Sequence, residues 1–242
     1  MRWQALGLAL WLIGCAGTET GNPSFDGTLG YAAYSSQPAQ VALRGEASVV
    51  VEAAWLVLGD VRFDRQERCG DAAAEHVDVP GLGAGDHAGS HAPASSVEFA
   101  SGRYCTVRMA LQLPATQPDG APAELTGHSI LISGKQRGRA FRIASSLAAP
   151  VTLRASAAGG FELDDAQSGV LLGFDLNAWL LNISWSDAAP DGSGTAIIDA
   201  THAPEVLRQF EANVAQGVKL FRDRDGDGLL DAEPEELAHA PE

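Results

Sequence analysis

Apolar and polar residues alternate along most of the chain between residues 27 and 199. The clearest runs are residues 54–63 and 103–113, in which apolar side chains recur with a period of two, as in a β-strand with one buried face. Similar runs, separated by Gly, Pro, Ser and Asp, are residues 27–34, 40–44, 48–53, 97–99, 125–134, 140–145, 150–156, 161–163, 170–176, 179–185 and 195–199. The run at residues 179–185 could instead open as a helical turn. Such a succession of short strands predicts an all-β domain over residues 27–200, either an antiparallel β-sandwich or a barrel-like sheet.

Residues 204–222 follow the period of a helix instead. Their apolar residues recur at steps of three and four, namely Val206, Leu207, Phe210, Val214, Val218 and Phe221. Glu205 near the start and Lys219 near the end suit the dipole of a helix. We therefore expect one C-terminal amphipathic helix over residues 204–222, with its apolar stripe packed on the sheet, and a short second helix from Pro234. Together with the loop between them, these form the last predicted unit, residues 201–242.

The loop after the predicted helix carries carboxylates at its first, third, fifth and ninth positions, Asp223, Asp225, Asp227 and Asp231, and a glycine at its sixth. Calcium binds six to eight oxygen ligands at about 2.3–2.6 Å, and the glycine permits the sharp turn that brings them together. The pattern resembles the calcium-binding loops of EF-hands, dockerins and thrombospondin type 3 repeats.

The resemblance implies a role for each residue of the loop. Asp223, Asp225 and Asp227 would bind Ca²⁺ through their side chains, Leu229 through its carbonyl, and Asp231 directly or through water. At the twelfth position, where an EF-hand has glutamate, this chain has Pro234, so Glu233 or Glu235 would have to complete the site. The alternative is a solvated acidic turn, because Asp and Gly are also common turn residues.

The N-terminus has the pattern of an export signal. Within residues 1–14, Arg2 supplies a positive charge near the start, and residues 5–13 form an apolar run too short to span a bilayer permanently. The run ends in Leu12-Ile13-Gly14-Cys15, which resembles the lipobox of bacterial lipoproteins and implies cleavage before a lipidated Cys15. Alternatives are an ordinary secretory signal or a short anchor helix. Ala16, in place of an aspartate that favours inner-membrane retention, favours the outer membrane, facing the periplasm or the cell surface. Residues 15–26 are small and polar and predict a flexible tether.

The formal net charge of −15 narrows the possible partners. A strongly acidic protein repels nucleic acids and anionic membrane surfaces and attracts divalent cations. Membrane attachment through the lipid at Cys15 is compatible with this charge, whereas DNA or RNA binding is not expected.

Two cysteines remain besides Cys15. Cys69 and Cys105 form an even pair in a protein expected in an oxidising compartment, which predicts a disulfide bond. Two free thiols are the alternative. A catalytic thiol is less favoured, because no histidine can be assigned to it from the sequence.

Residues 69–95 predict a long surface excursion with one short strand near residues 76–79. His87 and His91 are four residues apart, which on a helix would suit a transition metal. Their surroundings are rich in glycine, so a polar loop is the favoured interpretation.

No local motif of a nucleophile elbow, a zinc protease or a phosphate-binding loop is present. As a whole, the chain resembles β-sandwich lipoproteins of Gram-negative bacteria, a resemblance that implies no activity. We therefore expect a non-catalytic envelope lipoprotein with a structural Ca²⁺ site, acting as a binding or scaffold module.

Two alternatives to this function remain open. One is a carbohydrate-binding module, which would need an exposed row formed by the aromatic residues Tyr31, Tyr34, Trp55, Trp179 and Trp185. The other is a hydrolase with a dispersed site, which would need a deep pocket with His beside Ser or with paired carboxylates.

Overall fold

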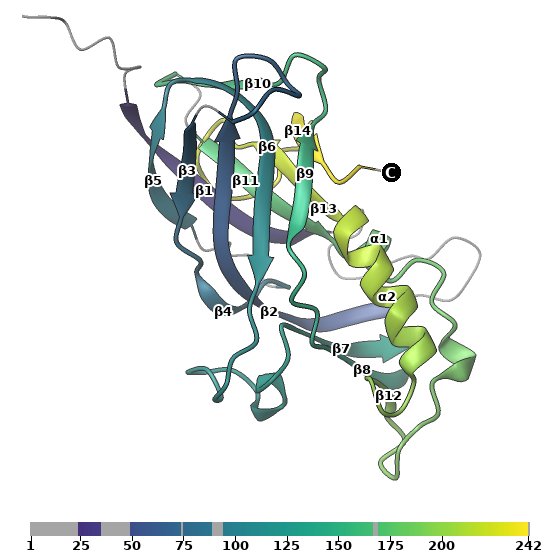
Figure 1. The fold of residues 1–242 in the computed structure, drawn as a ribbon. Helices are drawn as coiled ribbons and strands as arrows, with labels where there is room; N and C mark the ends of the chain where they lie inside the picture. The colour runs from purple at the N-terminus through teal and green to yellow at the C-terminus, as the bar shows by residue number, and fades with distance from the viewer. Residues whose placement is uncertain (1–23, 35–48, 74, 89–93, 167–168, 242) are drawn as a thin grey trace, which may run out of the picture.

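The computed structural model describes residues 24–34, 49–73, 75–88, 94–166 and 169–241 (Figure 1). The predicted signal, the lipid site Cys15, most of the tether, the predicted strand at residues 40–44 and His91 lie outside these ranges. Within them, no helix is long and apolar enough to cross a membrane.

The described residues form a 14-stranded sheet and two α-helices, which confirms the all-β fold. The strands are β1 (Ser24–Tyr34), β2 (Val49–Arg65), β3 (Glu75–Val79), β4 (Gly83–Asp86), β5 (Ala94–Ala100), β6 (Gly102–Leu111), β7 (Ile130–Gln136), β8 (Arg139–Ser145), β9 (Val151–Ala155), β10 (Phe161–Leu163), β11 (Gly169–Asp175), β12 (Ala196–Ile198), β13 (Val218–Arg222) and β14 (Glu236–His239). The helices are α1 (Leu176–Trp179) and α2 (Pro204–Gln216), and short 3₁₀ turns occur at Ala123–Leu125 and Trp185–Asp187.

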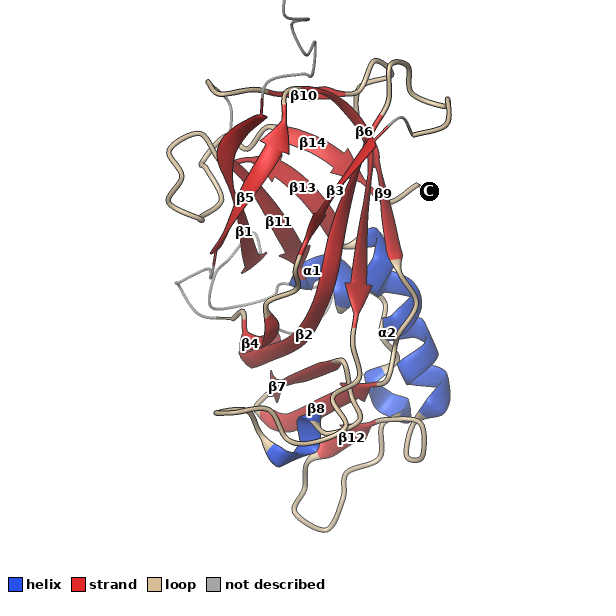
Figure 2. Ribbon diagram, turned by 60° about the vertical axis from the view of Figure 1, so that its left-hand side comes forward, coloured by secondary structure: helices blue, strands red, loops and turns tan. Residues whose placement is uncertain are grey.

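The strands form one large curled sheet, a half-barrel, in the order β12-β8-β7-β2-β6-β9-β14-β13-β11-β1-β5. This is the barrel-like alternative, not two stacked sheets. The long strand β2 makes the curl possible, because β7 pairs with its first half and β6 with its second. Strands β3 and β4 pair with β2 as well. Figure 2 shows the resulting curl, with β7, β8 and β12 continuing the sheet below β2.

Two strand pairs depart from the antiparallel arrangement that the sequence predicted. β1 runs parallel to β11, and β12 runs parallel to β8. Each pair joins segments that are far apart in sequence, so no hairpin turn forces the two strands to run in opposite directions. Alternation along a strand reports which face is buried, but it carries no information about the direction of the neighbouring strand.

The predicted helix over residues 204–222 is correct only as far as Gln216. α2 buries Val206, Leu207, Phe210 and Val214, as its stripe predicted, but Val218–Arg222 form β13. The change occurs at Gly217, whose carbonyl accepts a hydrogen bond of 2.7 Å from the Asp175 amide. Pairing of β13 with β11 then satisfies the backbone groups that a longer helix would have satisfied internally.

Two further segments differ from the predictions for local reasons. The predicted strand over residues 179–185 is replaced by the end of α1 and a 3₁₀ turn. Asp175 caps α1, because its Oδ1 accepts from the amides of Asn177 and Ala178. Beyond the helix, Asn182 has a positive φ of 57°, which does not fit a strand. The short helix expected from Pro234 is absent, and β14 occupies its place.

Strand β14 joins two parts of the sheet. It lies between β13, with Leu220 opposite Ala238, and β9, with Arg154 opposite His239. On one side of β14 the sheet continues through β9, β6, β2, β7, β8 and β12. On the other side it continues through β13, β11, β1 and β5. The four-residue strand therefore joins parts of the sheet that are formed by segments distant in sequence.

Aromatic side chains fill the inside of the curl. Phe63 and Phe99 pack edge to face with ring centroids 5.2 Å apart, and Tyr104 lies against both rings. Below them, Trp179 of α1 packs against Phe210 of α2 at 6.1 Å. Burial of these rings supplies a large part of the hydrophobic stabilisation.

The predicted disulfide bond between Cys69 and Cys105 is present, with a Cα–Cα distance of 5.3 Å. It ties the exposed loop after β2 to the buried face of β6.

Candidate metal centre

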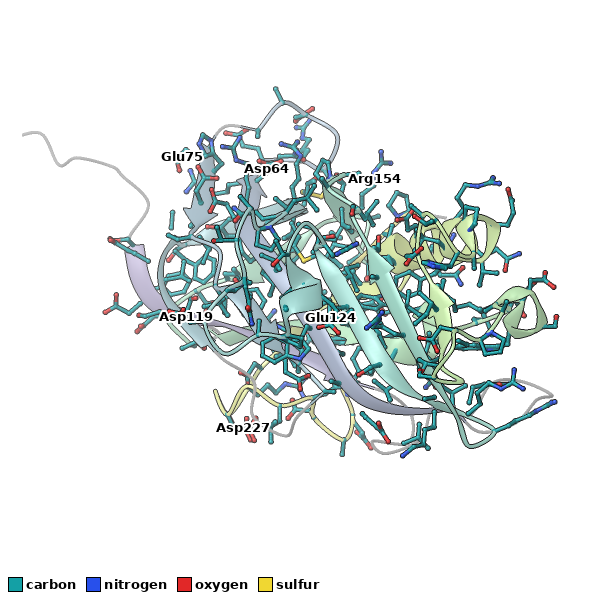
Figure 3. All side chains as sticks on the ribbon, turned by 90° about the horizontal axis from the view of Figure 1, so that it is seen from below. Asp64, Glu75, Asp119, Glu124, Arg154 and Asp227 are labelled. Atoms are coloured by element: carbon teal, nitrogen blue, oxygen red, sulfur yellow. A yellow bond between two sulfur atoms is a disulfide. The ribbon has the colours of Figure 1, made fainter. Side chains whose placement is uncertain are left out.

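The acidic loop, residues 223–235, connects β13 to β14. Its first residue is anchored to the sheet, because the Asp223 amide donates to the Gly169 carbonyl at 3.1 Å. Gly228 rests on β1: a Cβ on Gly30 would lie 3.3 Å from the Gly228 Cα. The loop is thus fixed at its start and middle by β11 and β1, while Asp227 lies at the outer surface (Figure 3).

Three carboxylates of the loop converge. Asp223, Asp225 and Asp227 each offer an oxygen, and these oxygens lie within 4.8 Å of one another. Hydrogen bonds from the backbone of the loop hold each side chain. Asp223 accepts from the amides of Gly226 (2.9 Å) and Gly228 (3.1 Å), Asp225 from that of Asp227 (3.3 Å), and Asp227 from that of Leu229 (2.7 Å).

Two glycines make this conformation possible. Gly226 and Gly228 have φ angles of 70° and 73°, in the left-handed region that glycine occupies without strain. Gly228 is the glycine that the sequence pattern placed at the turn. The backbone therefore bends twice within three residues, which directs alternate carboxylates toward one point.

Asp223 is the buried member of the group, with 4% of its surface exposed. Burial raises the pKa of its carboxyl group, and the nearby charges of Asp227 and Asp225 raise it further. The hydrogen bonds from Gly228 and Gly226 oppose this shift. A divalent cation between the three carboxylates would remove their mutual repulsion and favour the ionised form of Asp223.

The other predicted ligands lie outside this group of three. Glu235 is held by arginines, at 2.8 Å from Arg224 and 3.7 Å from Arg222. Asp231 and Glu233 are not part of the converging group, and coordination by the Leu229 carbonyl stays a prediction. The residue that would complete the coordination in place of Pro234 thus stays a prediction.

A cavity of about 630 Å³ lies beside the loop. Asp223 and Asp225 line it, together with Arg222, Arg224 and Glu235. It offers room for water molecules next to two of the three carboxylates, which suits a hard cation that completes its shell with water.

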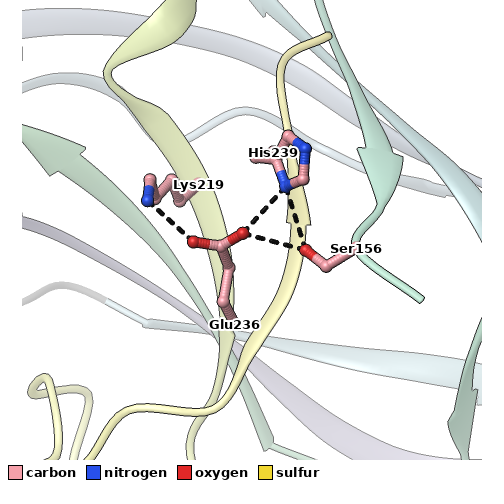
Figure 4. Close-up of polar contacts among 4 residues, drawn as sticks. All are labelled: Ser156, Lys219, Glu236 and His239. Atoms are coloured by element: carbon pink, nitrogen blue, oxygen red, sulfur yellow. Dashed lines mark hydrogen bonds and ion pairs between the residues drawn. The ribbon is translucent and has the colours of Figure 1, made fainter.

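A second polar cluster gathers on β14 and its neighbours (Figure 4). One oxygen of Glu236 lies 2.9 Å from the Ser156 hydroxyl and 2.8 Å from Nδ1 of His239, and the other lies 2.7 Å from the Lys219 ammonium. The Ser156 hydroxyl is 3.0 Å from the same Nδ1. Sequence patterns did not reveal this cluster, because Ser156 is 80 residues from Glu236.

The geometry of this cluster differs from that of a nucleophile, base and acid in series. In such a triad the carboxylate and the hydroxyl contact opposite nitrogens of the imidazole ring. Here both contact Nδ1, so Glu236 is placed to accept the Ser156 proton directly. Lys219, Ser156 and His239 together lower the pKa of Glu236 against the effect of burial, which makes this carboxylate a weak base.

None of the five aromatic residues considered for sugar stacking is fully exposed. Tyr31 and Trp179 are buried, whereas Tyr34, Trp55 and Trp185 are half-buried. Trp185 packs on Phe141 with centroids 4.9 Å apart.

His87, predicted to lie in a polar loop, is instead buried at the end of β4 with 2% of its surface exposed. Its ring packs against Phe174.

Comparison with protein-family models, with curated proteins and with solved structures finds no match for this chain.

Proposed function

We propose that the chain is a non-catalytic lipoprotein of the bacterial cell envelope whose β-domain is stabilised by one Ca²⁺ ion in the acidic loop. The observation that carries the ion site is the convergence of the oxygens of Asp223, Asp225 and Asp227 within 4.8 Å. The protein would serve as a binding or scaffold module held at the outer membrane by lipid on Cys15.

The chemistry of the donors supports Ca²⁺ over other metals. All three converging groups are carboxylates, which are hard ligands, whereas zinc and copper sites generally include imidazole or thiolate. Calcium accepts irregular geometry and high coordination numbers, while magnesium requires a near-ideal octahedron. A loop that offers three carboxylates and space for water therefore suits calcium better than magnesium.

Thermal unfolding with millimolar Ca²⁺ or with chelator tests the ion site. A ligand that binds only the folded state stabilises it by RT ln(1 + [L]/Kd), so a Kd of about 10⁻⁴ M gives about 1.4 kcal/mol at 1 mM. We expect a rise in Tm with Ca²⁺ that equal Mg²⁺ does not reproduce. Equal Tm values with Ca²⁺ and with chelator would refute the site.

A double variant locates the effect. Asp225→Asn with Asp227→Asn should abolish the Ca²⁺-dependent rise while circular dichroism still shows the β-sheet. The matched control, Asp71→Asn with Asp119→Asn, removes two exposed carboxylates elsewhere and should keep the rise. If both double variants lose the rise equally, the effect comes from the overall negative charge.

The lipid anchor has an independent test. Expression in a Gram-negative host with a fatty-acid probe should label the protein, and Cys15→Ser should remove the label. Retained labelling in this variant would show that Cys15 is not the lipidated residue.

A further inference from the structure

The curled sheet has a seam where its two sides approach each other. Strands β3 and β4, paired with β2, form one side, and β5 with the end of β1 forms the other. β5 pairs with β1 only as far as Gly30, so the last residues of β1 extend beyond it. Figure 2 shows β3 facing β5 in the upper part, with β4 below.

The backbone of His87 links the two sides at the lower end of this seam. Its amide donates to the Ala54 carbonyl of β2 at 2.9 Å, and its carbonyl accepts from the Ala33 amide of β1 at 3.3 Å. The preceding carboxylate, Asp86, strengthens the attachment to β2 by accepting from the Ala54 amide at 2.9 Å. His87 is therefore bonded to strands on both sides of the seam.

The side chain of His87 is fully enclosed, yet neither ring nitrogen has a hydrogen-bond partner. The ring lies 5.7 Å from that of Phe174 on β11, and a Cβ on Gly85 would come within 3.2 Å of Nε2. A buried polar group without a partner is unusual and destabilising, and a buried charge without one is more destabilising still.

The groups that face the ring give little support to a positive charge. Burial lowers the pKa of His87. The backbone of Tyr31 on β1 and the charge of the neighbouring Asp86 oppose this effect but are weaker. Asp86 is exposed and already engaged by backbone amides. β11 presents the apolar ring of Phe174.

We propose that His87 is an acid-sensitive latch that holds the seam closed while its imidazole is neutral and releases it on protonation. In the closed protein the protonated ring would be enclosed among apolar groups, with the backbone of Tyr31 and the charge of Asp86 as its only support among the described residues. In an opened seam the same ring would reach water and take up the proton at its ordinary pKa. Acid therefore favours the opened form, and the bonds to Ala33 and Ala54 are those that break.

The direction and size of the effect follow from proton linkage. The pKa of His87 is lower in the closed form than in the opened form. The stability of the closed form relative to the opened form is therefore greatest above the ordinary pKa of 6.5 and declines as the pH falls below this value. One proton changes the opening equilibrium by at most about tenfold per pH unit. The decline ends once the pH falls below the pKa of the closed form.

Two measurements on the chain test the latch. Proton NMR follows each histidine ring from pH 8 to pH 5, and we expect the His87 ring to stay neutral after exposed rings have titrated. Hydrogen exchange follows the amides of Ala33 and His87, corrected for the intrinsic effect of pH. Their protection should fall by up to about tenfold per pH unit below 6.5.

A matched pair of variants separates the latch from general acid sensitivity. His87→Leu removes the buried imidazole and should make protection at Ala33 independent of pH in this range. His76→Leu makes the same substitution at an exposed site on β3, and protection at Ala33 should still decline as the pH falls. Titration of the wild-type His87 ring near 6.5, or an equal decline in both variants, would overturn the proposal. The ring titration decides the question even if His87→Leu fails to fold.

Discussion

The cluster around Glu236 yields a quantitative prediction, because this carboxylate of β14 contacts three side chains where β14 joins two parts of the sheet. The change is Glu236→Gln, which keeps the size of the side chain and removes its charge. The amide can still accept one hydrogen bond, but it loses the ion pair with Lys219 and cannot accept from Ser156 and His239 as strongly.

The size of the effect follows from these contacts. A hydrogen bond to a charged group contributes about 1.5–3 kcal/mol when well buried, and exposed ion pairs contribute about 0–1 kcal/mol. The Glu236 side chain is 29% exposed. We therefore expect a loss of about 1–2 kcal/mol at pH 7, or about 2–8 °C in Tm for a chain of this size.

The pH dependence supplies a second signature. The pKa of Glu236 is lowered, because the contacts from Lys219, Ser156 and His239 outweigh the opposing effect of burial. A carboxyl group whose pKa is lowered by folding stabilises the protein above its ordinary pKa of 4.5. This stabilisation is lost as the pH falls through the pKa of the group in the folded protein. The difference between wild type and Glu236→Gln should therefore shrink in acid.

Urea denaturation from pH 7 to pH 3 measures both effects. The control is Glu162→Gln, because Glu162 is 69% exposed and pairs with Arg103 at 3.4 Å. It should change stability by less than about 0.5 kcal/mol. Equal stability of the two variants at pH 7, or a difference from wild type that persists unchanged at pH 3, would refute the reasoning.

Three further changes test the fold. Replacing Cys69 and Cys105 by serine should cost about 3–4 kcal/mol in urea denaturation, because the disulfide closes a loop with a sequence separation of 36; a loss under 1 kcal/mol would contradict the expected constraint on the unfolded chain. Gly169→Ala should cost about 1–3 kcal/mol, because its Cβ would lie 2.2 Å from a backbone oxygen of the acidic loop. The control is Gly159→Ala, whose Cβ meets no atom within 4 Å. Equal Tm values of the two variants would show that the loop can shift. Phe210→Ala should cost about 3–5 kcal/mol by leaving a cavity under α2, and an unchanged urea midpoint would show that the site is not packed as described.

Much of the candidate metal centre was predictable from the sequence, because its geometry is local. Asp223, Asp225 and Asp227 are two residues apart, and Gly228 has the positive φ that the turn requires. Backbone bonds within the loop orient all three carboxylates. The spacing did not reveal that Glu235, one of the two residues expected to complete the site, contacts Arg222 and Arg224.

The segment around Gly217 shows where local patterns become ambiguous. Val214, Val218 and Phe221 are spaced as one face of a helix, yet Val218 and Leu220 also alternate as in a strand. Both conformations bury most of the same apolar residues. Pairing with β11 decided between them, and that strand lies more than 40 residues earlier in the chain.

Features that depend on neighbouring residues could be predicted from the chain: the strand periodicity, the amphipathic face of α2 and the spacing of the acidic loop. The parallel pairs, the insertion of β14 between β9 and β13 and the burial of His87 became evident only in the folded protein. Periodicity specifies which side of an element avoids water, but the partner that covers this side is selected by packing and hydrogen bonding between segments far apart in the chain.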